Sequence, residues 1–136
     1  MSRQFLTGLA VAALCLVSAG GARAREPAFA PQVNNAQGVK VTVTPRNVAK
    51  DVQTWDFEVA METHTHPLDD ALESSSVLIA DGKQYPPSGW EGAPPGGHHR
   101  KGVLHFKAIA PQPASLELQI RLTGDPAPRS FEWRLK

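Results

Sequence analysis

Five histidines of this 136-residue chain fall in one short region, and imidazole is the side chain best suited to binding a transition metal near neutral pH. They occur in three segments: His64 and His66 in METHTHPLDD, His98 and His99 in GAPPGGHHRKG, and His105 in GVLHFK. Three or four imidazoles on two converging segments would suit copper or zinc. Whether they converge depends on the elements that carry them.

The strongest secondary-structure signal is the run TWDFEVAMET, residues 54–63, in which apolar and polar residues alternate. This period of two predicts a central strand of a sheet. Shorter runs predict further strands near residues 39–43, 76–80, 83–85, 102–107, 116–122 and 131–135, with a hairpin turn at Asp81-Gly82. Prolines and glycines crowd residues 86–97, where we expect no regular ladder. About seven short strands without a helical stripe predict an all-β fold, an immunoglobulin-like β-sandwich, with a small β-barrel as the alternative.

The first two histidine segments lie at strand ends in this scheme. His64 and His66 follow the predicted strand 54–63 in the phase opposite to its core residues, so they should face solvent or a loop. His98 and His99 begin the next long strand, and antiparallel strands bring the end of one beside the start of another. The preceding Gly96-Gly97 pair gives the backbone freedom to aim the imidazoles. We therefore expect a metal site with ligands His64, His98 and His99, and His66 as an auxiliary fourth.

The other candidate residues receive different interpretations. His105 alternates with core-facing neighbours, so we expect it on the solvated face of its strand. Trp90 lies outside any predicted strand, and we expect it to plug the sandwich end beneath the histidines rather than to stack on a ligand. A structural network of loop histidines, without a metal, is the competing interpretation of the cluster.

Residues 1–24 have the character of a signal peptide, with a basic start, an apolar run over 5–17 and the A-x-A pattern of Ala22-Arg23-Ala24. Cleavage after Ala24 would remove the single cysteine, Cys15, and so exclude a blue-copper site, which needs a thiolate. It would also remove two of the 14 Lys and Arg residues, leaving 12 against 13 Asp and Glu, a net charge of −1. Residues 25–37 are expected to form an extended lead-in and residues 38–136 one β-sandwich domain.

These features favour a periplasmic or secreted protein that binds Cu(II) or Zn(II) as a chaperone, buffer or sensor. The alternative is an immunoglobulin-like interaction or accessory module that docks a partner protein and whose histidine loop is structural. Charges of both signs are mixed along the chain, so we expect neither nucleic-acid binding nor membrane insertion after cleavage. No nucleophile motif such as GxSxG is present, and we expect that the protein is not an enzyme.

The segments FEVAMETH (57–64), WEGAPPGGHH (90–99) and GVLHF (102–106) resemble a group of small exported or membrane-tethered prokaryotic proteins. That group pairs an F-x-V-x-x-x-T-H strand end with a W-x-G-x-x-G-G-H-H-x-x-G-x-L-x-F segment. The resemblance covers about half of the chain that follows the leader. It implies a β-sandwich fold and groups His64 with His98 and His99, without implying a reaction. His66 departs from the pattern, in which a serine commonly stands at that place.

Overall fold

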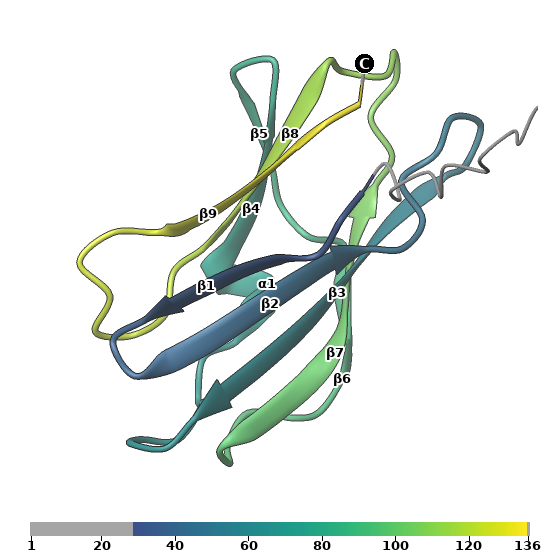
Figure 1. Ribbon diagram of the computed structural model, residues 1–136. Coiled ribbons are helices and arrows are strands. Elements are labelled where there is room, and N and C mark those ends of the chain that lie inside the picture. The colour runs from purple at the N-terminus through teal and green to yellow at the C-terminus, as the bar shows by residue number, and fades with distance from the viewer. Residues whose placement is uncertain (1–28, 136) are drawn as a thin grey trace, which may run out of the picture.

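The computed structural model describes residues 29–135, which form two antiparallel β-sheets (Figure 1). The predicted signal peptide, residues 1–24, lies outside the described residues. The first sheet has the order β1-β2-β3-β7-β6, with β1 Gln32–Ala36, β2 Val39–Pro45, β3 Thr54–Thr63, β7 His99–Lys107 and β6 Gly89–Gly92. The second has the order β5-β4-β8-β9, with β5 Lys83–Tyr85, β4 Ser76–Ala80, β8 Ser115–Ile120 and β9 Arg129–Arg134.

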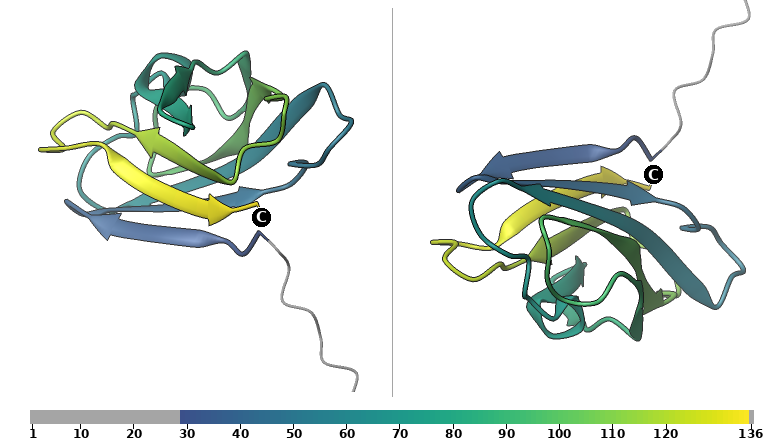
Figure 2. Two further views of the ribbon diagram at one scale, coloured as in Figure 1. Left: turned by 90° about the horizontal axis from the view of Figure 1, so that it is seen from above. Right: turned by 90° about the horizontal axis from the view of Figure 1, so that it is seen from below.

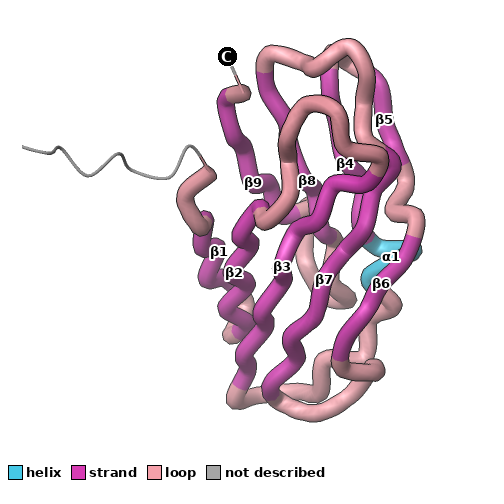
Figure 3. The backbone as a smooth tube through the Cα atoms, turned by 90° about the vertical axis from the view of Figure 1, so that its right-hand side faces the viewer, coloured by secondary structure: helices cyan, strands magenta, loops and turns pink. Residues whose placement is uncertain are grey.

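The two sheets are stacked as layers, which the end-on views separate clearly (Figure 2). Figure 3 shows the five strands of the first sheet side by side, with the second sheet behind them. The prediction of a β-sandwich is confirmed, and the described strands do not close into a barrel. No helix within residues 29–135 is long and apolar enough to cross a membrane.

Alternation of apolar and polar residues builds the core between the sheets, because successive side chains of a strand point to opposite faces. β3 is the central strand of the first sheet, as predicted, and its apolar residues are buried: Trp55, Phe57, Val59 and Met61. The second sheet contributes Leu116, Leu118, Ile120 and Phe131 in the same way. Phe57 touches both Phe106 of its own sheet and Trp133 of the other, at centroid distances of 5.6 and 5.7 Å. The interlocking apolar faces are the main stabilising contribution to the fold.

Three elements differ from the sequence-based expectation. Residues 32–36, within the expected lead-in, form β1 and pair with β2 through a turn at Gln37-Gly38. The expectation of no ladder over residues 86–97 is wrong at β6, which pairs with β7. β6 is a short edge strand that needs a partner on one side only, so the prolines around it do not prevent pairing. A one-turn helix, α1 (Leu72–Ser75), precedes β4 and buries Leu72.

Side chains join β1 to β9 along one side of the sandwich. The Gln32 side chain donates to the backbone carbonyl of Glu132 and accepts from its amide. The buried Arg129 donates to the carbonyls of Ala36 and Val39, at 2.9 and 2.7 Å, and pairs with Asp125. These bonds hold the β1–β2 turn against the second sheet.

Candidate functional site

The two histidine-bearing loops are joined by backbone hydrogen bonds at one end of the sandwich. Thr63 N donates to His98 O at 2.9 Å, where β3 ends and β7 begins. Beyond this point Leu68 N donates to Gly97 O at 2.9 Å, and Gly96 N donates to Leu68 O at 2.8 Å. Segments 64–68 and 96–98 thus lie side by side, as the antiparallel arrangement predicted. We call residues 64–70 and 93–99 together the histidine end; it lies at the lower end of β3 and β7 in Figure 1.

The four candidate ligands of the histidine end, His64, His66, His98 and His99, all have exposed side chains. His99 lies directly opposite Glu62 in the β3–β7 register, on the outer face of the sheet. His66 Nδ1 lies 2.9 Å from the hydroxyl of Thr65, which holds that ring beside its own loop. Within residues 29–135 no three His, Cys, Asp or Glu side chains are grouped so that they could hold a metal ion. The structure therefore joins the segments but does not bring the four imidazoles to one point.

Arg100 lies directly beneath the histidine end, and sequence reasoning did not find it. Its side chain faces inward beside His99 and is only 2% exposed. The guanidinium donates to three backbone carbonyls, those of Ala93 (3.2 Å), Leu68 (3.4 Å) and Asp70 (2.6 Å). Burial lowers the pKa of Arg100, against the opposing influence of nearby carboxylates. Arg100 has the same phase in β7 as the buried Leu104 and Phe106, and this phase was the sequence signal that could have revealed it.

Trp90 lies beside Arg100 at the histidine end. It packs against the core, and its indole Nε1 donates to Ala93 O at 3.0 Å, so the expectation of a plug is confirmed. The Arg100 guanidinium lies 5.4 Å from the centroid of the Trp90 ring, a cation–π contact. The ring also occupies the space above Gly102, where a Cβ would meet it at 2.5 Å.

A second polar cluster lies on the outer face of the first sheet, away from the histidine end. His105 is on that face, as predicted, and its Nδ1 lies 2.6 Å from Asp56 Oδ1. Its Nε2 is 3.3 Å from Glu91 Oε2, but the alignment is not that of a hydrogen bond. The bond to Asp56 raises the pKa of His105 above its ordinary 6.5, with a smaller contribution from Glu91. Sequence reasoning missed the cluster because it depends on the register that sets Asp56 opposite His105.

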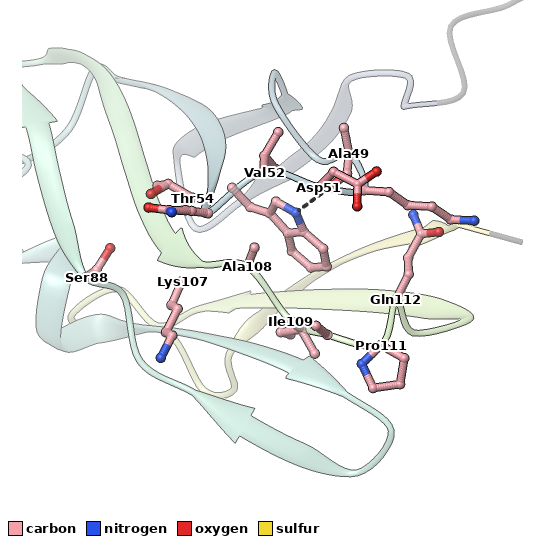
Figure 4. A pocket seen from close by; sticks show the side chains of 14 residues that line it. Ala49, Asp51, Val52, Thr54, Ser88, Lys107, Ala108, Ile109, Pro111 and Gln112 are labelled. Carbon is pink, nitrogen blue, oxygen red and sulfur yellow. Dashed lines mark hydrogen bonds between the residues drawn. The ribbon is translucent and has the colours of Figure 1, made fainter.

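A hollow lies at the other end of β3. It has a volume of about 920 Å³ and is lined by residues 49–55, Ser88 and residues 107–112. Figure 4 shows Val52, Ala108 and Ile109 around it, with Asp51 and Lys107 at its margins. Its floor includes buried Trp55, whose Nε1 donates to Ala49 O at 3.1 Å. We call this hollow the loop-end cleft. Loops without a recognisable motif build it, so it could not be predicted from the sequence.

Comparison with known proteins gives a distant structural likeness. No protein-family model and no curated protein matches the sequence. Among solved structures the chain is similar to MPT63, a secreted protein of Mycobacterium tuberculosis, with 14% identity and a TM-score of 0.40. The match covers 78% of this chain and 91% of that chain. The chain is thus a small all-β protein with a distant structural similarity to a secreted mycobacterial protein.

Proposed function

We propose that this is an exported protein that binds Cu(II) or Zn(II) at the histidine end, with His64, His98 and His99 as ligands and His66 as an auxiliary one. The observation that supports this proposal best is the set of three backbone hydrogen bonds between the two histidine-bearing loops. These bonds hold the two histidine-bearing loops side by side, and the proposal requires the imidazoles to reach a common ion by rotation of their side chains. Rotation of exposed side chains is fast and costs little.

Two carboxylates lie next to the histidine-bearing segments. Glu62 faces His99 across the sheet, and an Asp69 carboxylate oxygen lies 4.0 Å from the place that a Cβ on Gly96 would occupy. A carboxylate near an imidazole can bind the ion itself or fix the histidine tautomer. The chemistry of the donors favours Cu(II) or Zn(II), since the chain beyond residue 24 has no cysteine and Met61 is buried. An exposed site of this kind can exchange its ion, as a chaperone, buffer or sensor requires.

The test is calorimetric titration of Cu(II) and Zn(II) into the protein that begins at residue 25. We expect binding that the His98→Ala/His99→Ala variant weakens strongly, because two of three main ligands are lost. His105→Gln is the matched control: it removes an imidazole from the same strand, outside the histidine end, and should leave the affinity unchanged. Equal affinity in the parent and the double variant, or none tighter than about millimolar in the parent, would contradict the proposal.

The same titration carries a pH signature. Imidazole binds metal only when it is unprotonated, so the affinity should fall as the pH drops below about 6.5. An affinity that stays constant from about pH 7.5 to pH 5.5 would point to carboxylate ligands instead.

A second candidate function is an interaction module, for which the loop-end cleft is the favouring observation. A partner side chain could enter this cleft between Val52 and Ile109. With metal chelated, we expect a partner from periplasmic extract to be retained by the parent and by the His98→Ala/His99→Ala variant. The Ile109→Glu variant, which places a charge in the cleft, should lose it. Retention that instead depends on added metal and on His98 and His99 would favour the first function.

A further inference from the structure

Arg100 is a buried cation that touches no carboxylate among the described side chains. Removing a charge from water is costly, and buried charges are normally paired or fully hydrogen-bonded. Here the guanidinium is bonded to main-chain carbonyls, and the face of Trp90 lies beside it. The negative charges that act on it, from Asp69, Asp70 and Glu73, do so over a distance, without an ion-pair contact. A hydrophobic residue at this core position would avoid the desolvation cost, so the cation calls for another explanation.

The explanation lies in which carbonyls are bonded. Leu68 and Asp70 belong to the loop that carries His64 and His66, whereas Ala93 belongs to the loop that leads to His98 and His99. Arg100 therefore spans both histidine-bearing loops from below. The planar guanidinium has five N–H donors in a fixed fork, so one side chain can bond to two loops at once. Lysine, with a single ammonium on a flexible stem, does not offer the same fixed geometry.

We propose that Arg100 is the positioning residue of the histidine end: it holds loop 64–70 against loop 93–98 and so sets the spacing between the two pairs of imidazoles. This inference rests on the proposed metal-binding function. Backbone hydrogen bonds of Leu68 with Gly96 and Gly97 join the same two loops. Arg100 adds side-chain hydrogen bonds to carbonyl groups of both loops. Because His99 and Arg100 are adjacent in β7, the outward imidazole and the inward guanidinium share one stretch of backbone.

The test compares Arg100→Lys with Arg134→Lys, which makes the same change at an exposed position on β9. Both variants are titrated with Cu(II), and the copper electron paramagnetic resonance spectrum is recorded. We expect the Arg100→Lys variant to bind copper about tenfold more weakly, the lower end of the range for changes to groups that orient metal ligands. Its spectrum should show fewer coordinated imidazole nitrogens, whereas the Arg134→Lys variant should match the parent. A core residue that only stabilises the fold would lower the melting temperature without changing the ligand set.

Amide hydrogen exchange separates this inference from the proposed function. In the Arg100→Lys variant without metal, the amides of Gly96 and Leu68 should lose protection, while those of β8 and β9 keep it. If the parent binds no copper or zinc, the proposed function fails, and the exchange result still decides whether Arg100 joins the loops. Unchanged affinity, spectrum and loop exchange in Arg100→Lys would overturn the inference.

A measurement on the parent alone covers the case in which the variant does not fold. Zinc is added to ¹⁵N-labelled protein, and the Nε–H resonance of Arg100 is followed together with the amides of Leu68 and Gly96. Ordering of the loops by zinc should shift the Arg100 resonance and slow exchange at both amides. Zinc binding that leaves all three signals unchanged would show that the site is independent of Arg100.

Discussion

His105 lies between two carboxylates of very different exposure. The Asp56 side chain is 27% exposed and the Glu91 side chain 82%, while that of His105 is 23% exposed. Solvent strongly screens the interaction of His105 with the exposed Glu91. Most of the stabilisation of the charged imidazole must therefore come from Asp56. This agrees with Asp56 as the main cause of the raised pKa of His105. The cluster is therefore a coupling between β3 and β7 that depends on pH.

The direction of that dependence follows from the raised pKa. Protonated His105 stabilises the folded state fully below about pH 6.5, the ordinary pKa of histidine, and the contribution is lost as the pH rises through the higher folded-state value. We expect the Asp56→Asn variant to lower the pKa of His105 and to be less stable than the parent by about 1 kcal/mol at acidic pH. The difference should shrink above the folded-state pKa.

The measurement is a nuclear magnetic resonance titration of the His105 ring, together with urea unfolding at about pH 5.5 and pH 8.5. Glu132→Gln, which changes an exposed carboxylate on β9, serves as the control. An Asp56→Asn difference of the same size at both pH values would mean that the pair does not act through the charge of His105.

At the scale of elements, the close approach of β6 and β7 is set by two facing glycines. Gly92 and Gly102 are paired in the ladder, and a Cβ on Gly92 would lie 2.4 Å from the Cα of Gly102. A Cβ on Gly102 would also meet the Trp90 ring. These contacts give a physical reason for the Trp-x-Gly and His-His-x-x-Gly spacing of the sequence. The glycines let the edge strand lie close enough for Trp90 to cover the core.

Replacing Gly102 by alanine tests this packing. We expect the Gly102→Ala variant to lose about 1–3 kcal/mol of unfolding free energy, because the Trp90 ring and the β6 backbone must both shift. Gly89→Ala is the matched control on the same pair of strands, since a Cβ there meets nothing within 4 Å. Urea unfolding of both variants gives the comparison. A Gly102→Ala variant as stable as Gly89→Ala would show that β6 can move away from β7 without a loss of unfolding free energy.

The strands that alternate cleanly could be predicted from the sequence, whereas β6 could not. In β3 and β8 the large apolar residues face the second layer, and burial enforces the period of two. β6 has only four residues, two of them glycine, and its pairing comes from β7 rather than from its own pattern. Arg100 was missed for a related reason: the apolar signal of β7 begins at residue 102, and no local pattern shows that a charged residue two positions earlier is buried in the same phase.

At the scale of the whole molecule, the sandwich places its two candidate binding regions at opposite ends of β3. The loop-end cleft surrounds Thr54 and Trp55, and the histidine end begins after Thr63. The sequence could predict that the two histidine-bearing segments lie side by side, because this arrangement needs only two antiparallel strands. The loop-end cleft could not be predicted, because it depends on how the loops 49–53 and 108–112 pack against the core. Register and loop shape come from long-range packing, and no local pattern carries them.

The bonds between β1 and β9 have a consequence for the order in which the strands assemble. Gln32 meets Glu132, and Trp133 Nε1 donates to Ala30 O, so partners about one hundred residues apart in the chain must find each other. Before β9 docks, β1, β2 and β3 can pair with one another but lack the strand that their side chains bond to in the second sheet. Closing so long a loop is entropically costly and comes late in folding. β9 therefore docks late in folding, and until then one flank of the apolar core stays open to water and to other chains.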